Sequence, residues 1–131
     1  MITNELLQNH PFATEVVREW FIEKMQKSFV SSDVPEDFKE MMRKQGLPDE
    51  KLIKMFQNSP RVLFDVFDEN SIRINIVYDY FKEMFKWGIN SFMSEEGYLS
   101  RIEAEHVGVK AAFAALEDKL LCIRDVNKLN A

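Results

Sequence analysis

Glu103 and His106, separated by one helical turn, are the residues best suited to metal chemistry. In ferritin-like bundles a Glu-x-x-His pair supplies part of a di-iron site, which also needs a second such pair and two further glutamates. The other histidine, His10, has no glutamate three residues before it. We therefore expect no metal and no cofactor. We interpret His106 as a polar residue in an apolar helix seam, sensitive to pH because histidine titrates near neutrality.

Cys122 is the single cysteine, and no histidine lies close to it in the sequence. A buried structural thiol is therefore a better interpretation than a catalytic nucleophile. The chain also has no glycine-rich phosphate loop, no Gly-x-Ser-x-Gly and no His-x-x-x-His. These patterns lead us to expect a protein that is not an enzyme and has no catalytic residues.

Residues 38–58 loosely follow a helix-turn-helix pattern, with Gly46 in the turn. Asp49 and Glu50 would begin the second helix, where they would face DNA phosphates. Six basic residues against five acidic ones over residues 36–61 leave +1, and the whole chain has a net charge of −5. Nucleic-acid binders usually carry a basic surplus. A DNA-binding regulator is therefore the alternative hypothesis, and nucleic acid is not the expected partner.

The C-terminal third predicts one long helix over about residues 100–127. It opens with Ser100 and Glu103 in the spacing of a capping box. One face, the apolar seam, repeats at four-three spacing like a coiled coil. The seam consists of Ile102, His106, Val109, Phe113, Leu116, Leu120 and Ile123. A second face, the small-residue stripe, consists of Ala104, Gly108, Ala111, Ala115 and Cys122.

The small-residue stripe is the predicted interaction site, because small side chains let another element approach closely. We expect this helix to be contacted from two sides. Its own chain covers one side, and either its own chain or a second copy covers the other. A monomeric bundle and a homodimer through this helix both remain open.

The rest of the chain predicts further helices from its proline and capping residues. A short helix from residue 4 precedes helices expected at 11–30, 35–46, 48–58, 60–68 and 72–92. Within the last of these, Gly88 would weaken the helix by up to about 1 kcal/mol. Residues 72–76 also alternate like a strand, so a hairpin at about 61–78 remains the alternative. The predicted fold class is therefore an all-α bundle of five or six helices, with α+β as the minor alternative.

Length and composition predict a single domain over residues 1–131. Hydrophobic residues make up 46% of the 131 residues and charged residues 30%, a globular balance. No stretch approaches the roughly 20 apolar residues of a membrane span, and no signal segment is evident. We expect a cytoplasmic protein with no membrane partner. The function that fits is a small acidic protein-interaction module, a regulator or adaptor that binds a protein partner or a second copy through the C-terminal helix.

Overall fold

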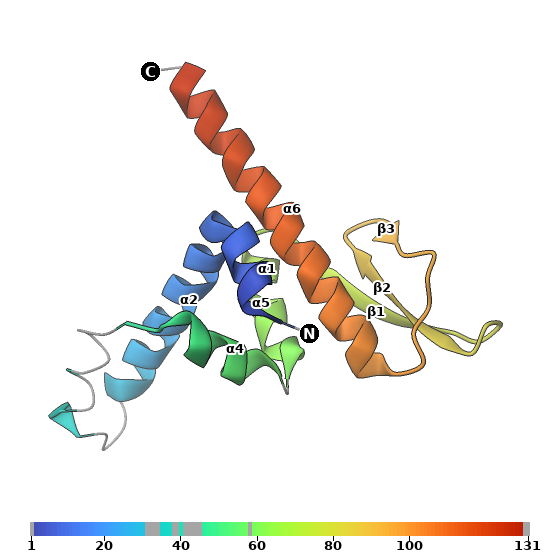
Figure 1. Cartoon of the computed structure of the whole chain (residues 1–131), viewed down its shortest axis with the longest axis horizontal. Coiled ribbons are helices and arrows are strands. Elements are labelled where there is room, and N and C mark those ends of the chain that lie inside the picture. Colours follow the sequence, from blue (N-terminus) through green and yellow to red (C-terminus); the bar gives the residue numbers. More distant parts are fainter. Residues whose placement is uncertain (1, 31–34, 38–39, 41–45, 58, 130–131) are drawn as a thin grey trace.

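The chain has an α+β fold in which a three-stranded antiparallel sheet precedes one long C-terminal helix (Figure 1). The computed structural model describes residues 2–30, 35–37, 40, 46–57 and 59–129. The elements along the chain are α1 (Asn4–Asn9), α2 (Pro11–Val30), α4 (Asp49–Gln57), the 3-10 helix η1 (Pro60–Leu63), α5 (Phe64–Glu69), β1 (Ile74–Asp79), β2 (Met84–Ile89), β3 (Phe92–Met93) and α6 (Arg101–Leu129).

The all-α prediction is wrong, because residues 72–92 form strands where one long helix was expected. Asp79 explains the reversal of the chain between β1 and β2. Its Oδ1 accepts hydrogen bonds from the backbone N–H groups of Phe81 at 3.0 Å and Lys82 at 3.2 Å. Glu83 then adopts a φ of 54°, which a right-handed helix does not contain. The turn carries no glycine or proline, so the sequence hides it.

The alternative hairpin at about 61–78 is also wrong in its position. Residues 60–69 are helical in η1 and α5, as the short helix expected at 60–68 predicted. Ser71 has a φ of 63° in the turn that follows α5. The alternating residues 72–76 do lead into a strand, but β1 pairs with β2 further along the chain.

Gly88 lies in β2 and has a different role from the one expected. A Cβ at this position would lie 2.7 Å from the carbonyl oxygen of Phe92 and 3.0 Å from Cε of Met93. Such distances require glycine, because any side chain would push β3 away from β2. Gly88 is therefore a packing requirement of the sheet.

Several helices lie where the sequence predicted them, including α1, α2, α4 and α6. The backbone N–H of Glu103 donates to Oγ of Ser100 at 3.2 Å, which is the N-terminal half of the predicted capping box. Most of the helix expected at 35–46 lies outside the described residues.

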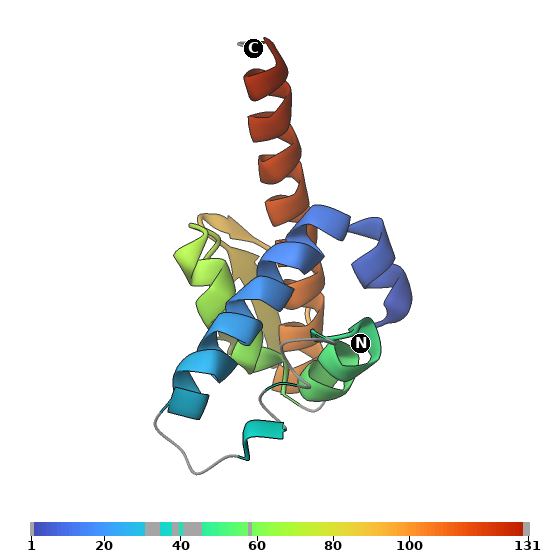
Figure 2. The same ribbon diagram turned by 90° about the vertical axis from the view of Figure 1, so that its left-hand side faces the viewer.

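The core lies between α6, the inner face of the sheet and the N-terminal helices. α6 crosses the sheet and then continues beyond the body of the molecule (Figures 1 and 2). At the crossing, a Cβ on Gly108 would lie 3.2 Å from Cγ2 of Ile74 and 3.3 Å from Cβ of Trp87. The fully enclosed aromatic side chains of this core are Phe56, Phe67 and Phe113.

We predict that Gly108→Val lowers the free energy of unfolding by about 1–3 kcal/mol, because the added methyl groups overfill the contact between α6 and the sheet. Urea unfolding followed by circular dichroism measures this change. Lys110→Val, on an exposed part of the same helix, is the matched control and should change stability by less than about 1 kcal/mol. Equal stability of the two variants would contradict the close contact.

Candidate interaction surface

The small-residue stripe faces the chain's own sheet over its first part. Ala104 is fully buried, and Gly108 lies against Ile74 and Trp87. Ala111 and Ala115 are partly buried. Gly108 and Ala115 therefore pack within the chain itself. The role of the stripe as an interaction site stays a prediction.

Cys122 is exposed, so its interpretation as a buried structural thiol is wrong. The reason is the length of α6, whose last turns extend past the elements that cover its middle (Figure 2). Residues 121–127 are all exposed. Sequence spacing placed Cys122 on the stripe. It could not show that the elements packed against α6 stop before this residue.

The apolar seam is core in its middle and open at its ends. Val109, Phe113 and Leu116 are fully buried. Ile102 is 45% exposed at one end and Ile123 is 48% exposed at the other. The seam therefore joins the core of the molecule to an apolar surface on the projecting part of α6.

His106 sits on this seam with its Nδ1 buried, and no described residue forms a hydrogen bond with that atom. Burial lowers the pKa of His106 below the ordinary value of 6.5, and the positive charge of Lys110 contributes in the same direction. Among the described residues, no three His, Cys, Asp or Glu side chains gather in a way that could hold a metal ion. His106 is therefore a desolvated seam residue within the part of the chain that the structure shows.

A groove of about 610 Å³ lies between the first half of α2 and the last turns of α6. We call it the α2–α6 groove. Its apolar lining comes from Phe12, Val16, Leu120 and Ile123. Its polar lining comes from Glu15, Glu19, Arg124 and Asn127. The guanidinium of Arg124 lies 5.4 Å from the ring centroid of Phe12, so the two side chains stack across the groove.

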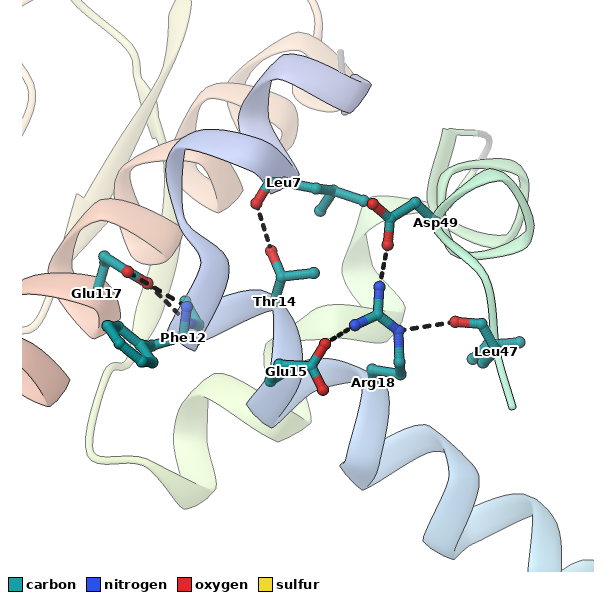
Figure 3. A network of polar contacts seen from close by, with 9 residues as sticks. Leu7, Phe12, Thr14, Glu15, Arg18, Leu47, Asp49 and Glu117 are labelled. Carbon is teal, nitrogen blue, oxygen red and sulfur yellow. Dashed lines mark hydrogen bonds and ion pairs between the residues drawn. The ribbon is translucent and has the colours of Figure 1, made fainter. Parts of the chain in front are cut away.

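Glu117 fixes the two walls of the α2–α6 groove relative to each other. Its carboxylate accepts hydrogen bonds from the backbone N–H groups of Phe12 at 3.2 Å and Ala13 at 2.7 Å (Figure 3). These amides belong to the first turn of α2, where no intrahelical acceptor exists. A carboxylate is also favoured there by the helix dipole. Glu117 is only 6% exposed, so the bond ties the start of α2 to α6 from inside the molecule.

Arg18 ties the next part of α2 to the segment before α4. Its Nε donates to the carbonyl oxygen of Leu47 at 2.8 Å, and its guanidinium forms ion pairs with Glu15 and Asp49 (Figure 3). Asp49 is thus already paired at the start of α4.

The helix-turn-helix hypothesis gains no support from the described part of residues 38–58. α4 buries Leu52 and Phe56 in the core. Its exposed residues include Glu50 and Lys51, which carry opposite charges. Most of the expected first helix lies outside the described residues. No observation there favours DNA binding.

The groove contains residues that sequence spacing identified and residues that it missed. Leu120 and Ile123 were recognised as members of the apolar seam. Phe12 and Glu117 were not, because their roles depend on contacts between residues more than 100 positions apart. No described helix is both long enough and apolar enough to span a membrane.

Comparison with known proteins identifies no relative: no family model, no curated protein and no solved structure matches the chain.

We predict that Glu117→Gln destabilises the fold by about 1–3 kcal/mol, because a charge-assisted pair of hydrogen bonds to the first amides of α2 is weakened. Urea unfolding of the variant measures the loss. Asp118→Asn, on the exposed side of the same turn, is the control and should change stability by less than about 0.5 kcal/mol. A Glu117→Gln variant as stable as the control would contradict the capping role.

The lowered pKa of His106 predicts a pH-dependent stability. The unfolded chain takes up a proton near the ordinary value of 6.5, while the folded chain resists protonation. Stability from this group is therefore complete above pH 6.5 and falls as the pH drops from there toward the lower pKa of the folded state. Unfolding free energies measured from pH 8 to pH 5 should show this slope, and His106→Gln should reduce it. His10→Gln is the control and should leave the part of the pH dependence that comes from His106 unchanged.

Proposed function

We propose that this chain is a small acidic protein-interaction module, a regulator or adaptor with no catalytic activity of its own. It binds an amphipathic helix of a protein partner in the α2–α6 groove. The observation that carries the proposal is the groove itself, an apolar channel between two helices whose relative position is fixed by the buried Glu117.

The shape and lining of the groove fit the recognition of a helix. Binding of an amphipathic helix requires a hydrophobic channel that accepts side chains spaced three and four residues apart. Phe12 and Val16 of α2 follow this spacing on one wall, and Leu120 and Ile123 of α6 follow it on the other. A bound helix would thus lie between α2 and α6 and bury their exposed apolar side chains.

The charges on the rim indicate the polar face of the partner. Glu15 and Glu19 lie on the α2 side of the groove, whereas Arg124 lies on the α6 side and is engaged with Phe12. A partner helix with lysine or arginine beside its apolar stripe would meet Glu19, and Glu15 where it is already paired with Arg18. Such rim charges contribute mainly to specificity and to the rate of association.

A homodimer through the C-terminal helix would use exposed turns of α6 next to the groove, with Ile123 shared between the two surfaces. The projecting turns of α6 carry exposed Leu121, Ile123 and Val126, which a second copy could cover. A cytoplasmic location belongs to the same proposal and is supported by the single, unpaired cysteine.

Ile123→Glu should abolish binding of an amphipathic helix, because it places a charge in the apolar floor of the groove. The probe is a synthetic helical peptide with leucine at positions i, i+3, i+4 and i+7 and lysine on its opposite face. Two-dimensional NMR of the labelled chain should show shifts concentrated on the residues that line the groove. The affinity should fall at least about tenfold in the variant.

Leu121→Glu is the matched control, because Leu121 is exposed on the same turn of α6 but does not line the groove. It should bind the peptide like the unchanged chain. Shifts spread over the whole acidic surface, or equal loss of binding in both variants, would contradict recognition in the groove.

A further inference from the structure

β1 is an edge strand of the sheet, because the strand order is β1-β2-β3 and β1 pairs only with β2 within the described chain. Edge strands carry backbone N–H and C=O groups that face away from the sheet. These groups form a template for pairing with another strand.

Hydrogen bonds around the sheet show which residues of β1 face outward. The N–H of Asn90 donates to the carbonyl of Arg73 at 2.9 Å, so this facing pair is a hydrogen-bonded one. Such pairs alternate along an antiparallel ladder. The backbone groups of residues 75, 77 and 79 therefore point to β2, and those of Ile74, Ile76 and Tyr78 point away.

The opposite side of β2 agrees with this alternation. Phe85 exchanges backbone hydrogen bonds of 2.8 Å with Tyr98, and the carbonyl of Trp87 accepts from the N–H of Ser94 at 2.9 Å. The backbone N–H and C=O groups of these two residues of β2 therefore point away from β1. No bond joins the outward groups of Ile74, Ile76 and Tyr78 to another described residue.

The outward edge also lacks the features that usually prevent strand addition. Natural edge strands carry charges, prolines or bulges. Residues 74–78 read Ile-Asn-Ile-Val-Tyr, with no charge and no proline, and their pairing with β2 runs without a bulge. Exposure rises along the strand to 45% at Val77. The first five residues of β1 are therefore suited to pairing on both of their edges, and the charged Asp79 ends the strand.

We propose that β1 pairs antiparallel with β1 of a second copy, about a twofold axis at Ile76, and forms a continuous six-stranded sheet across the two chains. An axis at this residue places Ile76 opposite its own counterpart and Ile74 opposite Tyr78 of the second copy. These are the outward-facing residues, so each facing pair exchanges two backbone hydrogen bonds. A twofold contact of this kind is closed and uses the same surface on both chains.

Charge complementarity selects a second copy and this register. With the axis at Ile76, Arg73 of each chain lies opposite Asp79 of the other. Oδ2 of Asp79 is paired with Lys86 of its own chain at 3.3 Å and Oδ1 holds the turn, so Arg73 of the second copy joins an existing ion pair at its outer side. Arg73 and Asp79 are on the face of the sheet that points away from α6, in a pair with closely spaced side chains. The guanidinium of Arg73 is free to turn toward Asp79, because its own contact with Asp68 is loose at 3.8 Å and its side chain is 78% exposed.

This pairing does not depend on the α2–α6 groove, which lies between the first half of α2 and the last turns of α6. It adds a second function to the proposed one, because two joined copies would present two grooves. Binding at both grooves of a dimer would raise the apparent affinity for a partner with repeated helices.

Sedimentation equilibrium over a concentration series tests the pairing in the full chain. The unchanged protein should dimerise, and Arg73→Glu should weaken the dimer roughly tenfold, because it sets two acidic pairs against each other across the contact. Ile123→Glu, which alters the projecting end of α6 and leaves β1 unchanged, should dimerise like the unchanged chain. A monomer throughout the series overturns the proposal, as does a dimer that Ile123→Glu breaks and Arg73→Glu does not.

Cysteine cross-linking tests the register in a Cys122→Ser background. Asn75 of one chain should face Val77 of the other, at a Cα separation that a disulfide can bridge. Mixing an Asn75→Cys protein with a Val77→Cys protein under mild oxidation should give the mixed cross-linked dimer. Each variant oxidised alone should give several-fold less. Cross-linking of either variant with itself, without the mixed product, overturns this register.

Discussion

The position of α2 against α6 depends on one buried carboxylate. Glu117 lies in α6 just before the helix projects beyond the body of the molecule. Its side chain accepts hydrogen bonds from the first free amides of α2. A buried charge is tolerated only where hydrogen bonds replace its water, and the start of a helix supplies them. The bond therefore fixes where α2 begins and holds Phe12 opposite Ile123. The groove exists because this bond holds the start of α2 beside the last third of α6.

The contact between α6 and the sheet is a second constraint, and it explains why only the ends of the apolar seam are open. Gly108 brings the helix backbone close to Ile74 and Trp87, so the sheet covers one side of α6. α2 contacts another part of the helix, and Phe113 and Leu116 of α6 are fully buried. Among the described residues, the projecting turns of α6 and the outer edge of β1 stay uncovered.

The sequence allowed prediction of most helices, because their caps and prolines act locally. Ser100 and Pro11 mark the starts of α6 and α2 without reference to the rest of the chain. The sheet was missed because its turn is built by the Asp79 side chain and by Glu83 at positive φ, with no glycine to mark it. The role of Gly88 depends on β3, and the role of Glu117 depends on α2. Neither can be derived from spacing along one helix.

The length of α6 separates the two exposed surfaces. Gly108 contacts the sheet, and Ile123 lines the α2–α6 groove. The fifteen residues of helix between them, at 1.5 Å each, place the sheet contact and the groove roughly 22 Å apart. A ligand at one end would not collide with a ligand at the other. Substitutions that reshape one surface need not disturb the second, so the two could diversify independently during evolution while the buried middle of the helix stays constant.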